Sequence, residues 1–279
     1  MRANSYDVIK AQIIPRIGNY SFKSIKPAQI SKMLGDIAKE GKSKSLVSRV
    51  RLLVNKMLED AVDNELLIKN PCRKIKLPPM EGSKEKAPFI GAEEKAIIDF
   101  VPQYLNLHKP HEPRRVGRMV VILIKTGMRQ EELLALRWED IDFSDDIIHI
   151  RRALDIDPND PTKAPKSAAS ARGIPLHEMV RREFEALGPQ NEGYIFQTKT
   201  GGLLETHNFR RDYRKFLEAA GVEYRAPHIT RHTFASDLRA AGVDVKTISR
   251  LLGHSRVNIS LDVYIHSDED AARDAIKKI

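Results

Sequence analysis

The spacing of apolar residues along the chain predicts a protein built mainly from amphipathic helices. Pro27 suits the first position of a helix, and Gly41 ends the run of apolar positions that follows. Those positions recur three and four residues apart: Ile30, Met33, Leu34, Ile37 and Ala38. A second, longer stripe begins near Lys44 and comprises Leu46, Val50, Leu53, Met57 and Ala61. We therefore expect two helices before Asn70-Pro71, where the helical pattern stops.

The rest of the chain predicts further helices with a small sheet between them. Helices are expected at 92–101, at 114–126 with Gly127 as C-cap, through 131–138, and in the stretches after His207 that are separated by Gly221, Gly242 and Gly253. A last helix is expected within 268–278. Residues 147–151 and the run around Ile174 have β character and predict an antiparallel hairpin, to which 194–197 adds a strand. The fold class is mainly α with a small antiparallel β-sheet (α+β).

A proline-rich segment divides the chain into two domains. Residues 77–88 read LPPMEGSKEKAP and combine three prolines with alternating charge, which is the composition of an extended linker. We expect a helical domain at 1–78, a linker at 79–88 and a second domain at 89–279.

The positive charge is concentrated in the first domain. Residues 1–80 hold 16 Lys and Arg against 7 Asp and Glu, whereas residues 81–279 hold 31 of each, so the whole net charge of +9 lies in the first 80 residues. This asymmetry is typical of a protein that binds a phosphate backbone, although basic surfaces also serve solubility. The expected DNA-binding residues lie on and before the second helix: Lys42, Lys44, Arg49, Arg51 and Lys56.

The composition also indicates where the protein works. The longest purely apolar run, Met119–Ile124, is far shorter than a membrane span, and the first ten residues lack the apolar core of a signal peptide. The single cysteine, Cys72, cannot form an internal disulfide, which fits a reducing compartment. A cytoplasmic, nucleoid-associated protein without membrane contact is expected.

Four motifs follow one another in the second domain. They are TGMRQEE at 126–132, Pro165-Lys166-Ser167 nine residues before Ile174-Pro175-Leu176, HITRHTFA at 228–235, and Leu252-Gly253-His254 with Tyr264 ten residues later. Over about residues 84–279 this set resembles the catalytic domain of the tyrosine recombinases, the phage and transposon integrase family. Residues 1–78 resemble an N-terminally shortened form of that family's helical core-binding domain.

The resemblance implies a catalytic role for each motif. It makes Tyr264 the nucleophile, Arg129 and Arg231 the phosphate-binding arginines, His228 the histidine of the His-x-x-Arg pair, Lys166 the hairpin lysine, His254 the last histidine and Glu132 the acidic support of Arg129. The chemistry needs these residue types, because a tyrosyl ester conserves the energy of the broken phosphodiester and two guanidiniums neutralise the phosphoryl oxygens. His228 is the expected proton acceptor and Lys166 the expected proton donor to the leaving oxygen. No cofactor, metal or ATP is expected.

The function implied by the resemblance is site-specific recombination or integration of DNA, as carried out by mobile genetic elements. Strands would be cut and rejoined through a 3′-phosphotyrosine intermediate and a four-way junction. The implied assembly is a homotetramer on two double-stranded DNA sites. The resemblance also allows a further partner, an accessory protein that sets the direction of recombination.

Other readings remain open at the level of sequence. Taken singly, Arg129 and Arg231 fit ordinary surface ion pairs, and Lys163 and Lys199 compete with Lys166. His228 and His232 lie four residues apart, as metal ligands on one helix face do. Residues 245–253 resemble the start of a helix-turn-helix, the element of a non-catalytic DNA-binding protein. Within the enzyme class, a type IB topoisomerase-like protein would use similar phosphate chemistry.

Overall fold

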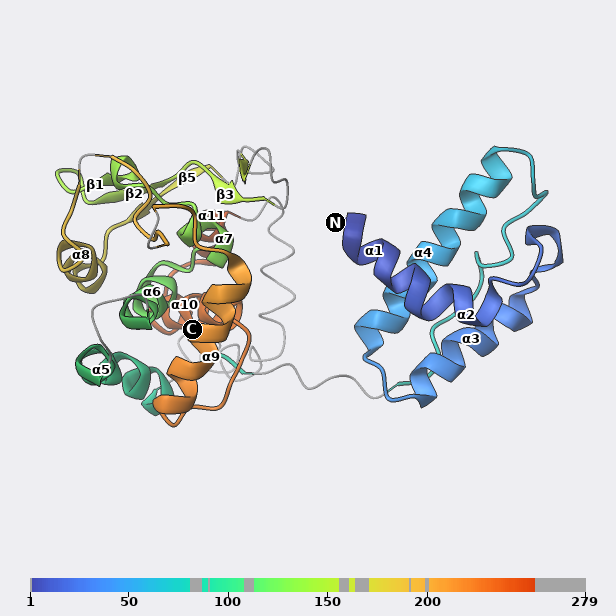
Figure 1. Cartoon of the computed structure of the whole chain (residues 1–279), viewed down its shortest axis with the longest axis horizontal. Coiled ribbons are helices and arrows are strands. Elements are labelled where there is room, and N and C mark those ends of the chain that lie inside the picture. Colours follow the sequence, from blue (N-terminus) through green and yellow to red (C-terminus); the bar gives the residue numbers. More distant parts are fainter. Residues whose placement is uncertain are drawn as a thin grey trace, which may run out of the picture. The chain divides into compact units, whose positions relative to one another are not determined.

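The chain divides into two compact units, Met1–Glu85 and Lys86–Ile279, in a computed structural model (Figure 1). The structure describes residues 2–80, 87–89, 91–107, 113–155, 161–163, 171–190, 192–198 and 201–253. Each unit has its own hydrophobic core.

The first unit is helical throughout its regular structure. Its elements are α1 (Arg2–Val8), a π-helical turn (Ile9–Ile13), α2 (Ile14–Ile17), a 3₁₀ turn (Phe22–Ser24), α3 (Pro27–Lys39) and α4 (Lys44–Asp63). Ser43 begins α4, since its hydroxyl oxygen accepts a hydrogen bond from the backbone N–H of Leu46 at 3.2 Å. The helices at Pro27 and Lys44 are therefore confirmed.

The buried face of α4 differs from the expected stripe by about one residue. Val50 and Ala61 of the expected stripe are buried, but its other members, Leu46, Leu53 and Met57, are only half-buried at the edge of the core. The neighbours of those three, Val47, Val54 and Leu58, are buried instead. Both stripes are apolar, so their spacing alone could not decide between them. The packing of α3 and of the π-helical turn against α4 made that choice, and Ile30, Met33, Leu34 and Ile37 of α3 are buried as expected.

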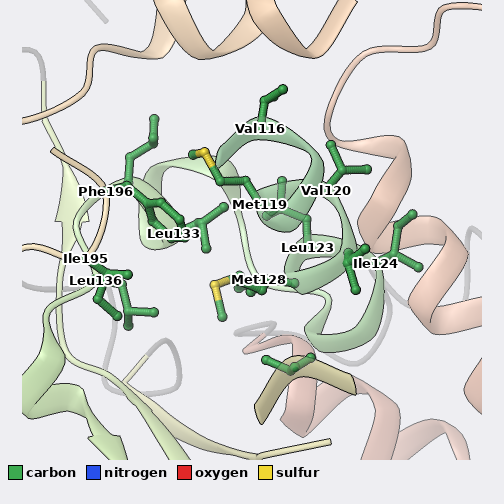
Figure 2. Packing of buried hydrophobic residues seen from close by; sticks show 14 of the residues in the cluster. Val116, Met119, Val120, Leu123, Ile124, Met128, Leu133, Leu136, Ile195 and Phe196 are labelled. Atoms are coloured by element: carbon green, nitrogen blue, oxygen red, sulfur yellow. The ribbon is translucent and has the colours of Figure 1, made fainter. Parts of the chain in front are cut away.

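The second unit is built around helix α6, which carries the longest apolar run of the chain. Its helices are α5 (Ala92–Leu107), α6 (Pro113–Thr126), α7 (Gln130–Leu134), α8 (Glu178–Glu185), α9 (Thr206–Ala219), α10 (Ile229–Ala240) and α11 (Val245–Leu252). Helix α6 packs against α5, α8, α9 and α10, and its run Met119–Ile124 is buried at every position. Figure 2 shows side chains of α6 facing those of Met128, Leu133 and Phe196. The longest apolar run of the chain is thus the centre of the core.

A three-stranded antiparallel sheet lies along one side of this unit (Figure 1). Its order is β1 (Ile141–Asp142), β2 (Ile147–Ile150) and β5 (Arg172–Pro175), with Ile148 opposite both Ile141 and Ile174. A separate pair, β3 (Ala153–Leu154) and β4 (Thr162–Lys163), lies between β2 and β5 in the sequence. The pairing of 147–151 with the run around Ile174 and the α+β class are confirmed.

Three expected elements are wrong in extent. The helix through 131–138 ends at Leu134, because Leu136 and Trp138 direct their backbone groups to Ile195 and Gly193 instead of to the helix. Residues 194–197 form isolated bridges, Arg137 to Tyr194 and Gln197 to Leu203, and no strand. Helix α5 continues across Pro102 to Leu107. The expected helix within 268–278, and the second helix of the helix-turn-helix, lie outside the described residues.

Candidate active site

Gly127 marks the point where three helices of the second unit converge. Its φ of +61° is favourable for glycine, and its backbone N–H donates to the carbonyl of Leu123 at 3.0 Å, which ends α6. A Cβ at this position would lie 2.3 Å from a ring carbon of Phe234 on α10 and 2.9 Å from a methyl carbon of Leu252 on α11. The absence of a side chain lets α10 and α11 approach the end of α6, and the chain then turns directly into Arg129.

Arg129 and Glu132 hold each other at the start of α7. The backbone N–H of Arg129 donates to Glu132 Oε2 at 2.8 Å, and Arg129 Nη1 donates to Glu132 Oε1 at 2.9 Å. The Glu132 side chain is 3% exposed, whereas that of Arg129 is 35% exposed. Glu132 therefore fixes one edge of a guanidinium that is open to solvent on its other side.

Arg172, on β5, completes the environment of this carboxylate and was missed by the sequence analysis. Its Nη1 donates to Glu132 Oε1 at 3.1 Å, its Nη2 donates to Glu132 Oε2 at 2.9 Å, and its Nε donates to the carbonyl of Leu251 at 2.6 Å. A signal was present, because side chains alternate across a strand and position 172 shares a face with the buried Ile174. A charged side chain on that face must find a partner inside the protein.

Opposing effects act on the pKa of Glu132. Burial raises it, but the hydrogen bonds and charge of Arg172, together with the backbone N–H and charge of Arg129, bring it below its ordinary value. Glu132 is therefore an ionised carboxylate at neutral pH.

Arg231, on α10, is buried and joins the ends of two other helices. Its Nη1 donates to the carbonyl of Gly127 at 2.9 Å, and its Nη2 donates to the carbonyl of Leu252. Burial and repulsion from Arg129 and Arg172 lower the pKa of Arg231 to about 9, against the attraction of Glu132, so the side chain remains a cation at pH 7. Three guanidiniums thus act on one another around one carboxylate, an arrangement that favours an anion such as a phosphate.

His228 lies at the N-terminus of α10, one turn before Arg231. Partial desolvation and the positive charges of His232, Arg231 and Arg129 lower the pKa of His228 below its usual value, although Glu131 opposes them. The imidazole is consequently neutral at pH 7 and able to accept a proton.

The His228 and His232 rings are neighbours, with centroids 5.1 Å apart and planes at 83°. Within the part of the chain that the structure describes, there is no group of three or more His, Cys, Asp or Glu side chains that could hold a metal ion. Among those residues, the pair has no third side chain of the kind that a protein metal site uses.

Of the remaining candidate catalytic residues, the structure describes Lys163 but not the others. Lys166, His254 and Tyr264 lie outside the described residues, as does Lys199. Lys163, the other competitor of Lys166, lies on β4 and forms an ion pair with Asp155.

The expected DNA-binding residues of the first unit fall into two groups. Lys42, Lys44 and Lys56 are exposed. Arg49 and Arg51 are half-buried: Arg49 Nη2 donates to the hydroxyl of Ser5 at 3.4 Å, and Arg51 Nη1 donates to the carbonyl of Ile75 at 3.2 Å. The arginines thus have contacts inside the unit, whereas the lysines point to solvent.

Across the described ranges, no helix is both long enough and apolar enough to span a membrane.

Comparison with known proteins identifies the family of the chain. The model of the phage integrase family matches residues 92–271. A tyrosine recombinase XerC-like protein of Caldanaerobacter subterraneus is 31% identical over 272 residues, which cover 87% of this chain and 67% of that protein. The ICEBs1 integrase of Bacillus subtilis is 28% identical, with coverage of 95% and 74%.

Solved structures show the same fold. The Tn1549 transposon integrase in complex with a circular intermediate DNA has a TM-score of 0.85 at 20% identity, over 99% of this chain and 92% of that chain. A lambda integrase tetramer bound to a Holliday junction has a TM-score of 0.69 at 18% identity, over 91% and 71%. Because the family match covers most of the chain and includes every described residue of the cluster around Glu132, this chain belongs to the phage integrase family of tyrosine recombinases, enzymes that cleave and rejoin DNA strands.

Proposed function

We propose that this protein carries out site-specific recombination of double-stranded DNA, with Tyr264 as the nucleophile. The main support for these catalytic roles is that Arg129, Arg231 and His228 come from two separate segments of the chain and lie close enough for their charges to act on one another. The cluster supplies positive charge for a phosphate and a neutral base beside it.

The reaction is a transfer of a phosphoryl group from the DNA to the protein and back. The Tyr264 oxygen bonds to phosphorus while its proton passes to His228, and the bond from phosphorus to the 5′ oxygen breaks as Lys166 protonates that oxygen. Arg129 and Arg231 bind the non-bridging oxygens, where negative charge builds up, and His254 adds a further hydrogen bond there. Attack by the 5′ hydroxyl of another strand reverses these steps and releases Tyr264.

The assembly that we propose is a homotetramer on two DNA sites, which exchanges one pair of strands at a time through a four-way junction. The first unit contacts the DNA backbone through its excess positive charge, and the exposed Lys42, Lys44 and Lys56 are best placed for it. An accessory directionality protein would act on this assembly.

Covalent capture of DNA tests the proposal. The protein is incubated with a library of nicked random-sequence duplexes, in which the short fragment released by cleavage diffuses away, and the DNA attached to protein is sequenced. We expect recovery of one sequence family by the wild type, none by Tyr264→Phe despite retained binding, and normal recovery by the matched control Tyr194→Phe. EDTA should leave capture intact, because the arginines supply the positive charge.

Each opposite result overturns a specific part of the proposal. Capture by Tyr264→Phe would remove the nucleophile assignment, and a loss in EDTA that a divalent ion restores would indicate a metal enzyme. Capture without sequence preference, together with relaxation of supercoiled DNA, would indicate topoisomerase-like activity.

A further inference from the structure

Arg172 connects the two parts of the site that lie farthest apart in the sequence. Its side chain is 5% exposed, and its three guanidinium nitrogens donate to Glu132 and Leu251, which are 40 and 79 residues away. We propose that Arg172 is a positioning residue for strand cleavage, which sets the guanidinium of Arg129 and the C-terminal end of α11 relative to each other. This inference rests on the proposed function, because it requires that Arg129 binds the phosphate that is cut.

The first connection runs through Glu132. Arg172 meets both oxygens of that carboxylate with two parallel donors, at 3.1 and 2.9 Å, which is the forked geometry that fixes a carboxylate in its plane. Arg129 then binds the same two oxygens through its backbone N–H and its Nη1. The orientation of the Arg129 side chain therefore depends on a carboxylate plane that Arg172 holds.

The second connection runs to the end of α11. Arg172 Nε donates to the carbonyl of Leu251, and Arg231 Nη2 donates to the carbonyl of Leu252. These carbonyls belong to the last turn, where a helix leaves its acceptors without internal partners. The chain leaves this turn through Gly253 at a φ of +67°, and His254 follows in the sequence. Arg172 and Arg231 together anchor the end of α11, the last described helix before His254 and Tyr264 in the sequence.

A lysine at position 172 would keep the charge but lose this geometry. The ammonium group is a single nitrogen, so it cannot donate in one plane to both Glu132 oxygens and also reach Leu251 as the rigid guanidinium does. Arg172→Lys therefore separates positioning from charge. Arg181 offers a matched control, because it also bonds carboxylates, those of Asp146 and Glu185, and one backbone carbonyl, that of Phe143 at 2.6 Å, and none of these belongs to the site around Glu132.

The test is single-turnover cleavage of the duplex recovered by covalent capture, measured with full-length protein. Arg172→Lys should cleave about 10–100-fold more slowly with its affinity for the duplex within about threefold of wild type, because misplacement of about 1 Å has such effects on chemistry. Arg181→Lys should cleave within about twofold of wild type. Fluorescence of Trp138, the one tryptophan of the sequence, reports whether each variant is folded.

A double-mutant cycle identifies the path. Arg129→Lys should slow cleavage by about 10²–10³-fold, the size found when one donor to the reacting group is lost. If Arg172 acts through Glu132 on Arg129, the double variant Arg129→Lys/Arg172→Lys should be little slower than Arg129→Lys alone. A purely structural role predicts instead that the two effects multiply.

The failures of the two proposals are distinguishable. Normal cleavage by Arg129→Lys would contradict the proposed function itself. Four results would overturn only the positioning role. The first is slow cleavage by Arg129→Lys with normal cleavage by Arg172→Lys, and the second is that the effects of the two substitutions multiply in the double variant. The others are a loss of DNA affinity in Arg172→Lys and its unfolding at the assay temperature.

Discussion

Replacement of Gly127 by alanine should destabilise the second unit more than the same replacement at any glycine with open space around it. The φ of +61° costs an L-residue about 1–2 kcal/mol. The added Cβ would also lie 2.3 Å from Phe234 and 2.9 Å from Leu252, and overpacking of this kind costs about 1–3 kcal/mol. We therefore expect a net loss of about 1–5 kcal/mol in the free energy of unfolding, after a gain of about 0.4–1 kcal/mol from a less flexible unfolded chain.

Gly188→Ala is the matched control for Gly127→Ala. Gly188 lies in the same unit at a φ of +77°, and nothing lies within 4 Å of a Cβ built there. Both variants share the backbone strain and the gain of about 0.4–1 kcal/mol from a less flexible unfolded chain. The difference between them isolates the contact with α10 and α11 and should be about 1–3 kcal/mol.

Urea unfolding followed by Trp138 fluorescence measures both variants. Trp138 is 6% exposed in the core of the second unit, and because the sequence has one tryptophan the signal does not mix the two units. Equal midpoints for Gly127→Ala and Gly188→Ala would refute the view that a close approach of three helices requires glycine here.

Three further predictions concern the reaction and DNA binding. Because the pKa of His228 is lowered and its neutral form is the base, kcat/KM for cleavage should fall with acid only below the ordinary histidine pKa of about 6.5; a fall centred above 6.5 would contradict this. Lys166→Ala should cleave normal DNA poorly but should cleave DNA with a 5′-bridging phosphorothiolate nearly as well as wild type, since a thiol of pKa about 8.5 leaves without a general acid. If the phosphorothiolate restored cleavage by Lys163→Ala instead, Lys163 would be the general acid. Replacement of each tested lysine of the first unit by alanine should reduce the slope of log affinity against log salt by about one. Lys95→Ala, in an exposed pair with Asp99, should leave the slope unchanged. Equal slopes for all variants would show that the DNA phosphates are bound by other residues. The lysines to be tested are Lys42, Lys44 and Lys56.

Local pattern was sufficient for the parts of this protein that depend on neighbours in sequence. The apolar run Met119–Ile124 predicted a core helix, and Gly127 predicted its end, because helix periodicity and left-handed caps are properties of a few consecutive residues. Helices α3 and α4 of the first unit were predictable for the same reason, as was the β character of the residues that form β2 and β5. The order of the four motifs was also sufficient to recognise the family.

Tertiary structure alone decided which of several equivalent local choices was used. Leu46 and Val47 are both apolar, and the packing of α3 and of the π-helical turn against α4 buries the second more deeply. The helix at 131–138 could have continued, but hydrogen bonds to residues 193 and 195 ended it at Leu134. The periodicity of a short segment carries no information about hydrogen-bond partners that lie far away in the sequence.

The candidate site shows the same division. The sequence singled out Arg129, Glu132, His228 and Arg231 as the described candidates for the chemistry, since their types and spacing match a recognisable pattern, and the fold brings them together. Strand alternation could indicate that Arg172 faces inward with Ile174, but it could not reveal the partners of Arg172, which lie 40 and 79 residues away and meet it only when β5 packs beside α7 and α11. An arginine near a strand end resembles any surface residue until the fold buries it against a carboxylate, because the cost of an unpaired buried charge arises only in the folded state.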